Sequence, residues 1–477
     1  MTGQHVPAST LGGLLGSWSD ASGPAYRSLA ERLRLLIADG RIMPGARLPS
    51  ERELTDALGV SRTTVASAYR ELRDRGYLTS KRGSGSVTSL PSRLEPELGR
   101  HHAPGIDTGG LYDFTCAASP AVAGLSTAFA EALDDLPAHL ATPGYHPQGI
   151  PELRAEIAAR YAERGLPTTP DQIIVTAGAL AATSIAVRAM TQIGDRVLTE
   201  SPTHPNSVDA IRRSGARVVA VPMSPGGWDL PLLEATIRQT APRAAWLVVD
   251  FQNPTGWLMS DADRQRLANA FARARTTAII DETLFELSLD GQRMPAPFAS
   301  FDPGGVITVG SASKSLWGGL RIGWLRVPES LVARILDARA SLDLGAPVLE
   351  QLVVARLLRS SLVEERRAGL ALRRGALASA LTSLLPDWRF ELPGGGLSLW
   401  CELPAAVGSS LVGVAQRHGV LLVAGSRFSP DGGLESFIRL PYTLDPHTLR
   451  DAVQRLADSY AGLAAGPPPR RTGAMIA

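Results

Sequence analysis

Short, unbroken runs of apolar residues recur through the middle of the chain. Those rich in Val, Ile and Leu predict seven strands, at 173–177, 196–200, 217–223, 245–250, 277–281, 306–310 and 322–327. None of the runs alternates strictly between apolar and polar residues, which is typical of strands covered by helices on both faces. Amphipathic helical stretches lie between several of them, so the pattern predicts an α/β domain with a mainly parallel sheet over residues 111–465.

An amphipathic helical pattern precedes this region. A first helix is predicted over 24–39, with its leucines on one face. Ser50 and Glu53 have the spacing of a capping box at the start of a second helix, which Gly59 ends, and Ser61 is placed to cap a third helix. Helix, tight glycine turn and helix in this order predict an all-α helix-turn-helix domain.

A basic hairpin is predicted directly after the third helix, in the segment YLTSKRGSGSV at 77–87. Its position is that of a wing, and the polar groups at the start of the third helix are placed to contact base edges and phosphates. A plain helical subdomain with a surface hairpin would show the same single pieces, so the interpretation depends on their order. The candidate DNA-binding residues are Arg52, Ser61, Arg62, Thr63, Thr64, Lys81, Arg82, Gly83 and Gly85.

Charge divides the chain in the same way. Residues 1–93 hold thirteen Arg or Lys and eight Asp or Glu, a net charge of +5, whereas the whole chain carries +2. A basic head at 10–88 is consistent with a polyanion partner, although a merely solvated basic face would give the same charge distribution. Residues 89–110 are interrupted by Pro and Gly and predict a linker, and residues 466–477 predict a disordered tail.

Composition also bears on location. The two cysteines are too few for a disulfide framework or a zinc site, so no metal is expected. The chain has no apolar run of membrane-spanning length and no secretory leader pattern. We therefore expect a protein of the reducing cytoplasm that acts at the nucleoid and has no membrane partner.

Lysine is almost absent, because only Lys81 and Lys314 are lysines among the 48 Lys and Arg residues. A guanidinium stays protonated, so arginine cannot replace lysine where a neutral amine must attack a carbonyl. Lys314 lies in GSASKSLWGGLRIG at 310–323, with Ser311 and Ser313 before it and Arg321 after it. The motif predicts a Schiff base with an aldehyde cofactor and a phosphate site, although a serine-rich turn with a surface lysine would have the same local sequence.

Further polar motifs follow the predicted strands. TAGAL at 176–180 opens a helix, where the backbone N–H groups of Gly178, Ala179 and Leu180 would meet a phosphate. Asp281 ends the strand at 277–281, where a carboxylate would keep a pyridine nitrogen protonated. Asn253, in NPTG, is a candidate donor to the phenolic oxygen of the cofactor ring.

Two more side chains are candidates with open alternatives. His204, in SPTHPN, is placed to stack on the ring face, or it is a structural histidine of a loop. Arg439, in FIRLPYT, is placed to bind the carboxylate of a substrate or effector, or it forms a structural ion pair.

These motifs resemble two known families. LPSER, GVSRTTV, AY and GYL resemble the GntR type of winged helix-turn-helix, and TAGAL, NPTG, the strand-ending Asp, SxSK and the two arginines resemble, as a set, the fold-type I PLP enzymes of the aspartate aminotransferase superfamily. A GntR head on such a body is similar to the MocR family of bacterial regulators over almost the whole chain. The segments LGGLLGSW and DETL resemble its YczR-type branch.

The resemblance implies a cofactor, partners and a further subdomain. It implies that Lys314 holds pyridoxal 5'-phosphate (PLP), that a homodimer binds repeated half-sites of operator DNA, that an amino-acid-like compound is the effector, and that the body ends in a smaller α+β subdomain. It assigns Asp281 to the pyridine nitrogen, Asn253 to the ring oxygen, Ser311, Ser313 and Arg321 to the phosphate, Arg439 to a carboxylate, and Tyr145 of GYHPQG to the cofactor of the neighbouring subunit.

Two departures from the pattern affect the expected activity. Many relatives carry a tyrosine shortly after the aspartate, whereas here Asp281 is followed by Glu282, Thr283 and Leu284, of which Thr283 is a partial substitute. His204 replaces an aromatic residue at the stacking position. These changes leave the expectation of PLP binding intact but argue against efficient transamination. The first hypothesis is therefore a transcription regulator in which PLP, or an amino compound bound through it to Lys314, changes operator binding. The alternative is a working aminotransferase whose head only localises it.

Overall fold

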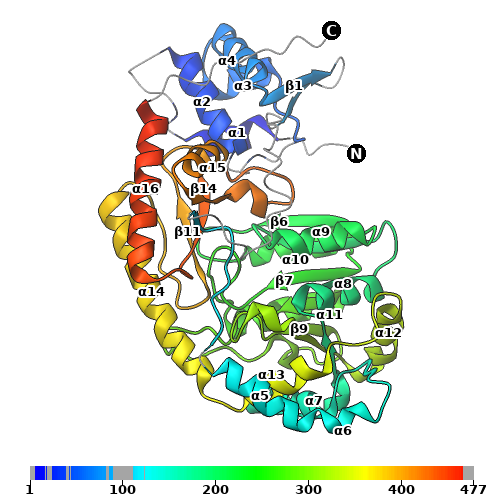
Figure 1. Ribbon diagram of the computed structural model, residues 1–477. Coiled ribbons are helices and arrows are strands. Elements are labelled where there is room, and N and C mark those ends of the chain that lie inside the picture. The colour runs from blue at the N-terminus through cyan, green and yellow to red at the C-terminus, as the bar shows by residue number, and fades with distance from the viewer. Residues whose placement is uncertain are drawn as a thin grey trace, which may run out of the picture.

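The computed structural model describes residues 6–16, 18, 24–38, 42, 45–81, 85–89, 111–122 and 124–465. These residues form an N-terminal helical head, a large α/β domain around one wide sheet, and a smaller subdomain that lies between the two (Figure 1). The predicted linker beyond Ser89 and the predicted tail at 466–477 lie outside the described residues. So do Arg82 and Gly83 of the predicted wing tip.

The head has the predicted winged helix-turn-helix. Its elements are α1 (Ala8–Leu15), α2 (Ala25–Ala38), α3 (Glu51–Leu58), α4 (Arg62–Asp74), β1 (Leu78–Lys81) and β2 (Gly85–Thr88). The capping box is confirmed, because Glu53 N donates to Ser50 Oγ and Ser50 N donates to the Glu53 carboxylate. Gly59 ends α3 with a φ of 64°, a conformation that glycine adopts without strain. The strands β1 and β2 pair antiparallel as a hairpin.

The apolar core of the head extends to residues outside the predicted helices. α1 buries Leu11 and Leu15 completely, and it packs against α2 and α3. Ala406, from the loop before α15 (Gly408–Arg417) of the small subdomain, belongs to the same apolar cluster. Figure 1 shows α1 beside α15. The head therefore touches the body through a small apolar contact.

Seven strands form the central sheet in the order β4-β10-β9-β8-β7-β5-β6. They are β4 (Ile173–Thr176), β5 (Arg196–Ser201), β6 (Arg217–Pro222), β7 (Ala244–Val248), β8 (Thr277–Asp281), β9 (Val306–Ser311) and β10 (Gly323–Arg326). β10 is antiparallel to both of its neighbours, β4 and β9, whereas the remaining pairs are parallel. The predicted strands and the mainly parallel sheet are confirmed, with strand ends shifted by at most two residues.

Side chains of the sheet enter two apolar clusters, one on each face. In β7, Leu247 belongs to one cluster and its neighbour Trp246 to the other, which explains why the strand sequences do not alternate in polarity. One face is covered by α7 (Pro151–Glu163), α10 (Leu230–Thr240), α11 (Asp261–Ala274) and α13 (Val348–Leu358), and the other by α8 (Ala179–Met190), α9 (Pro205–Arg213) and α12 (Glu329–Ala340).

The small subdomain confirms the expected C-terminal α+β unit. It contains α14 (Leu362–Leu384), β11 (Ser398–Glu402), α15, β12 (Val420–Leu421), β13 (Val423–Ala424), β14 (Phe437–Pro441) and α16 (Pro446–Ala465). β11, β14 and β13 form an antiparallel sheet, whereas β12 pairs in parallel with β3 (Tyr112–Asp113). From β3 the chain returns to the large domain through α5 (Leu125–Asp135) and α6 (Pro137–Leu140). The segment that follows the predicted linker is therefore anchored in the small subdomain.

A test of this core is Leu247→Ala in the central strand β7. Leu247 is fully buried, so its truncation is expected to lower the free energy of unfolding of the body by about 2–5 kcal/mol. Leu372→Ala on α14 is the matched control, because Leu372 is 73 % exposed and should change stability little. Denaturant unfolding followed by circular dichroism measures both, and equal midpoints would contradict the assigned burial.

Candidate cofactor site and nucleic-acid interface

The loop between β4 and α8 is shaped to hold an anion. Gly178, with a φ of 93°, precedes α8, and no side chain caps the first turn of that helix. The N–H groups of Ala179 and Leu180 lie at this positive end of the helix dipole. A Cβ added to Gly178 would come within 2.5 Å of a guanidinium nitrogen of Arg321. Only glycine lets the arginine approach the loop so closely.

Two serines of the predicted motif lie beside this loop. Ser311 ends β9, where its Oγ accepts a hydrogen bond from Ser313 N at 3.1 Å. The Oγ atom of Ser313 is buried, and the described residues offer it no hydrogen-bond partner. Such an atom is costly unless a ligand satisfies it. A guanidinium, an unsatisfied hydroxyl and an uncapped helix start together fit the phosphate group of PLP.

Lys314 lies in the loop after β9 and points toward the residues that follow β3. Its Nζ donates to the carbonyl oxygen of Ala117 at 2.8 Å. Burial lowers the pKa of the Lys314 amine, and the charge of Arg439 lowers this pKa further, whereas Cys116 and Asp281 oppose the shift. A lowered pKa increases the neutral fraction of the amine, which is the form that attacks an aldehyde.

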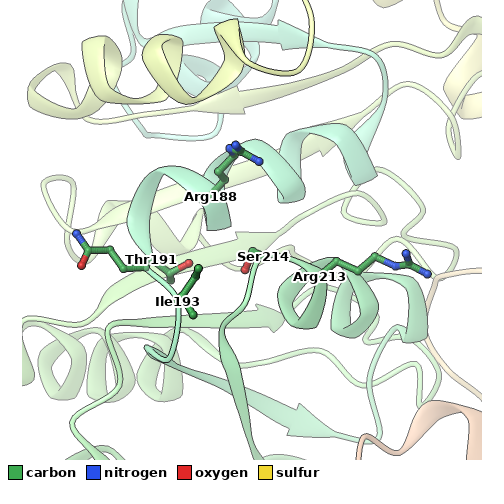
Figure 2. Close-up of a pocket in the computed structure, with 6 residues that line it drawn as sticks. Arg188, Thr191, Ile193, Arg213 and Ser214 are labelled. Atoms are coloured by element: carbon green, nitrogen blue, oxygen red, sulfur yellow. The ribbon is translucent and has the colours of Figure 1, made fainter.

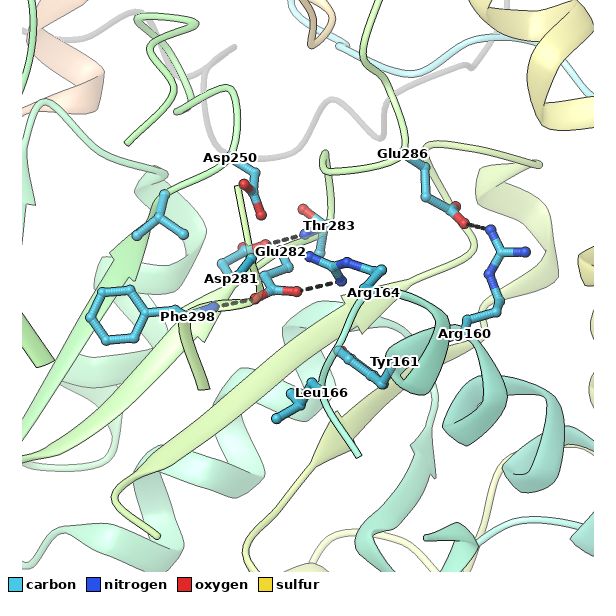
Figure 3. Close-up of polar contacts among 12 residues, drawn as sticks. Arg160, Tyr161, Arg164, Leu166, Asp250, Asp281, Glu282, Thr283, Glu286 and Phe298 are labelled. Carbon is cyan, nitrogen blue, oxygen red and sulfur yellow. Dashed lines mark hydrogen bonds and ion pairs between the residues drawn. The ribbon is translucent and has the colours of Figure 1, made fainter. Parts of the chain in front are cut away.

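Asp281 ends β8 and accepts a hydrogen bond from a residue just after the strand. Thr283 N donates to Asp281 Oδ1 at 2.9 Å (Figure 3). Burial raises the pKa of Asp281 to about 6, against the opposing effects of Thr283 and the positive charge of Lys314. Thr283 thus contacts the aspartate through its backbone N–H.

Ion pairs fix the backbone around Asp281. Arg264 and Asp250 are completely buried and form a pair at 2.5 Å, and Arg264 also donates to the carbonyl groups of residues 249, 259 and 296. Arg164 pairs with Glu282 at 2.7 Å, next to Asp281 in sequence (Figure 3). Breaking a buried pair leaves an uncompensated charge, so the Arg164–Glu282 pair holds the residue just after β8 and the Arg264–Asp250 pair holds the chain just after β7. The sequence analysis did not identify these pairs.

His204 and Arg439 are close enough to Lys314 to affect one another electrostatically. Burial lowers the pKa of His204 to about 3, and the charges of Lys314 and Arg439 act in the same direction. The imidazole is therefore neutral at pH 7, with Nδ1 2.9 Å from Ser207 Oγ. A neutral ring stacks on a cofactor without adding a fourth positive charge to the group formed by Lys314, Arg321 and Arg439.

Arg439, on β14, has hydrogen bonds to neutral groups. It donates to Thr115 O at 2.6 Å and to Asn253 Oδ1 at 3.4 Å, and its guanidinium lies 4.9 Å from the ring centre of Phe428. Its Nε is buried without a partner among the described residues. Burial lowers the pKa of Arg439 to about 10. A buried guanidinium whose partners are an amide and a carbonyl is suited to a carboxylate from a ligand.

Other parts of the large domain lie apart from this site. Tyr145 is 66 % exposed. A pocket of about 580 Å³ is lined by Arg188, Thr191, Gln192, Ile193, Arg213 and Ser214 (Figure 2). It lies at the C-terminal end of α8, about 18 Å along the helix axis from Gly178. In the described part of the chain, no cluster of His, Cys, Asp or Glu is arranged to hold a metal ion, and no helix is long and apolar enough to cross a membrane.

The candidate DNA-binding residues of α3 and α4 lie on the surface of the head. Arg52, Arg62 and Thr63 are exposed, whereas Ser61 caps α4 by accepting a hydrogen bond from Thr64 N at 3.1 Å. Gly85 begins β2 with a φ of 77°, and the guanidinium of Arg47 lies against it. Arg47, which the sequence analysis did not single out, adds a positive charge beside the wing. Lys81 ends β1, and the structure describes its backbone only.

Backbone carbonyl groups are the part of the site that sequence motifs did not indicate. Lys314 and Arg439 bind the carbonyl oxygens of Ala117 and Thr115, in the segment directly after the predicted linker. Every residue has a carbonyl group, so no side-chain pattern marks these positions.

Two family models match the chain. The model for bacterial regulatory proteins of the gntR family matches residues 25–87, and the model for aminotransferase class I and II matches residues 124–456. The chain is 30% identical to the uncharacterized HTH-type transcriptional regulator YdcR of Escherichia coli, over 87% of this chain and 94% of that protein. It is 29% identical to the probable rhizopine catabolism regulatory protein MocR of Rhizobium meliloti, over 93% of this chain and 95% of that protein.

The body is also similar to a solved aminotransferase. This is the α-aminoadipate aminotransferase LysN of Thermus thermophilus, in a complex with N-(5'-phosphopyridoxyl)-L-leucine. The TM-score is 0.68 and the identity 29%, over 77% of this chain and 97% of the other. The two families predicted from the motifs are thereby confirmed.

The raised pKa of Asp281 predicts a pH dependence of stability. Between pH 3.8 and about 6, the Asp281 carboxyl is protonated in the folded protein but mostly ionised in the unfolded chain. The resulting contribution to the free energy of unfolding is fully present below this range and is lost as the pH rises through it. Asp281→Asn should therefore raise the free energy of unfolding of the cofactor-free protein at pH 7.5, by on the order of 2–3 kcal/mol.

Denaturant unfolding between pH 4 and pH 8 measures this effect. Asp134→Asn, which removes an exposed carboxylate on α5, is the control and should leave the profile of the wild type unchanged. A profile of Asp281→Asn that keeps the same loss of stability near pH 6 would assign the titration to another group.

Proposed function

The chain belongs to the MocR-type regulators, with a GntR-family helix-turn-helix head and an aminotransferase class I and II body, and we propose that it is a PLP-dependent switch of operator binding. In this proposal the head binds operator DNA, PLP is held on Lys314, and an amino compound that reaches the cofactor changes the affinity of the dimer for DNA.

The observation that carries the proposal is the combination of two sites in one chain. The start of α4 exposes Arg62 and Thr63 on the head, and the body groups Lys314, Asp281 and Arg439 within electrostatic reach of one another. An enzyme alone has no need of the first group, and a DNA-binding protein alone has no need of the second.

The residues of the body support the binding of PLP in a defined orientation. Arg321, Ser313 and the start of α8 would hold the phosphate, Asp281 the pyridine nitrogen, Asn253 the ring oxygen and His204 the ring face. When bound, the cofactor supplies an aldehyde for covalent capture of amines and a ring that accepts electrons. Arg439 would select compounds that carry a carboxylate as well as an amine.

A homodimer is part of the proposal. Leu140, Tyr145, Leu342 and Leu344 are large side chains that are 49–70 % exposed. The loop that contains Leu342 and Leu344 approaches Tyr145, since a Cβ on Gly345 would meet His146 O at 3.0 Å. Exposed apolar groups gathered on one face favour an interface between subunits. Tyr145 would then face the cofactor of the partner subunit.

Regulation is favoured over rapid transamination by the position of Thr283. Thr283 contacts Asp281 through its backbone N–H, and Asp281 is followed by Glu282, Thr283 and Leu284, with no tyrosine to donate to the ring oxygen. An effector acts on DNA binding only through a different affinity for two arrangements of the dimer. The alternative of a working aminotransferase is favoured by the likeness of the body to LysN, and a single-turnover absorbance scan with a panel of amino acids would reveal it.

The proposed function is tested by a footprint over the DNA upstream of the gene, with and without PLP. We expect a protected region whose affinity changes when PLP is added. Arg62→Ala should weaken binding to this region by about 1–3 kcal/mol, because it removes one guanidinium contact to a base. Arg273→Ala, an exposed arginine on α11, is the control. Absence of any protected segment at moderate salt would refute DNA recognition.

The cofactor anchor is tested with the two lysines of the chain. Wild-type protein mixed with PLP should develop the absorption band of a Schiff base, and Lys314→Ala should not, because it has no amine at this position. Lys81→Ala, which removes the other lysine, should keep the band. A band that persists in Lys314→Ala would rule out Lys314 as the anchor.

A further inference from the structure

Residues 111–122 form a segment that joins the predicted linker to the body, and we call it the crossing segment. It begins in the small subdomain, where Tyr112 N donates to Gly419 O at 2.8 Å and Phe114 N to Leu421 O at 2.9 Å. The side chain of Phe114 is fully buried there. Beyond Phe114 the segment passes the amine of Lys314 and the guanidinium of Arg439.

Four side chains of the body donate hydrogen bonds to carbonyl groups of the crossing segment. Arg439 donates to Thr115 O at 2.6 Å, Thr443 to Cys116 O at 3.4 Å, Lys314 to Ala117 O at 2.8 Å and Arg366 to Pro120 O at 2.6 Å. The same nitrogen of Arg366 also donates to Leu316 O in the loop that contains Lys314. The middle of the segment is thus held mainly by side chains, rather than by pairing with another strand.

Two of these four donors are the side chains that the proposed function assigns to ligands. When the neutral amine of Lys314 condenses with an aldehyde, a C=N bond forms, and the carbonyl oxygen leaves as water with the two amine hydrogens. The neutral imine nitrogen that would result has no hydrogen to donate to Ala117 O. A carboxylate ligand competes likewise for Arg439, because a charged acceptor forms a stronger hydrogen bond than the carbonyl of Thr115.

We propose that the middle of the crossing segment is a latch, which Lys314 and Arg439 hold closed at Thr115 and Ala117 until ligands engage them, and which loosens at these two residues when they do. The latch proposal depends on the proposed function only for which ligands engage Lys314 and Arg439. Thr443 and Arg366 bind no proposed ligand, so Cys116 and Pro120 stay attached, and the pairing of Tyr112 and Phe114 with β12 keeps the linker end in place.

The pKa directions agree with this competition. Burial lowers the pKa of both Lys314 and Arg439, so both groups lie in an environment that disfavours their charge. No carboxylate is hydrogen-bonded to either side chain in the described residues, and carbonyl oxygens take that place. A ligand that brings an aldehyde to one group and a carboxylate to the other offers each a better partner than the segment does.

Hydrogen exchange of the full-length protein tests the latch. The amides of Tyr112, Phe114 and Thr115 are hydrogen-bonded, so a peptide that covers 111–122 reports on opening of the segment. Saturating PLP is expected to speed exchange in this peptide about 3- to 10-fold, the equivalent of one lost hydrogen bond. Pyridoxamine 5'-phosphate, which has the same ring and phosphate but no aldehyde, leaves the amine of Lys314 unbound and should have a smaller effect.

Two variants separate the latch from the cofactor. Lys314→Met without any cofactor should speed exchange in 111–122 as PLP does, since the donor to Ala117 O is absent. Arg154→Met is the matched control, because it removes an arginine that donates to a carbonyl, Pro170 O, elsewhere in the large domain. It should leave exchange in 111–122 unchanged.

Each outcome decides a separate question. If PLP binds, as its absorption shows, and exchange in 111–122 stays the same or slows, the latch is refuted while the cofactor assignment stands. If PLP does not bind, the cofactor assignment fails, and the comparison of Lys314→Met with the wild type still decides whether Lys314 holds the segment. Faster exchange with PLP and in Lys314→Met, but not in Arg154→Met, supports the latch.

Discussion

The insertion of β10 between β4 and β9 is the constraint on which the rest of the site depends. Gly323 is paired with Thr176 on one side and with Ser311 on the other. A Cβ on Gly323 would lie 2.6 Å from the carbonyl carbon of Gly178, so glycine is required where the two loops meet. Because β10 pairs with both β4 and β9 in this register, three parts of the site meet at one edge of the sheet. They are the start of α8, the loop after β9 that contains Ser313 and Lys314, and the guanidinium of Arg321.

The electrostatic balance of the site follows from that geometry. Lys314, Arg321 and Arg439 bring three basic groups together, and Asp281 and Asp113 are acidic groups within electrostatic reach of them. Burying such a group without counter-charges is unfavourable, and the lowered pKa values of Lys314 and Arg439 express this cost. Ligands that carry a phosphate and a carboxylate would offset it. His204 avoids adding to the cost because its imidazole is neutral.

Much of this arrangement could be predicted from the sequence, because polar and ionisable side chains stand at or just after the ends of apolar strand segments. The strand at 277–281 and its terminal Asp281 were predicted to the residue. The antiparallel direction of β10 was not, since a four-residue strand has the same apolar pattern in either direction. The contact between Thr283 and Asp281 was missed for a different reason, because two residues adjacent in a turn have several possible hydrogen-bond partners. The roles of these residues toward PLP remain predictions.

The head is connected to the cofactor site by two physical routes. One is covalent and runs from the predicted linker into the crossing segment. The other is the contact of Ala406 with the apolar core of the head. The loop that contains Ala406 is tied to the start of β14, since Leu403 N donates to Ser436 O and Gly408 N to Glu435 O.

Arg439 lies three residues beyond Ser436 on the same extended chain, so a displacement of β14 by a ligand must be accommodated by this loop or by the head that rests on it. In the proposed switch, the first route would transmit the state of Lys314 and Arg439 together. The second would respond to Arg439 alone. A protein with both routes can respond differently to its cofactor and to a carboxylate that binds beside it, which is the property a sensor needs to distinguish the empty, cofactor-loaded and effector-bound states.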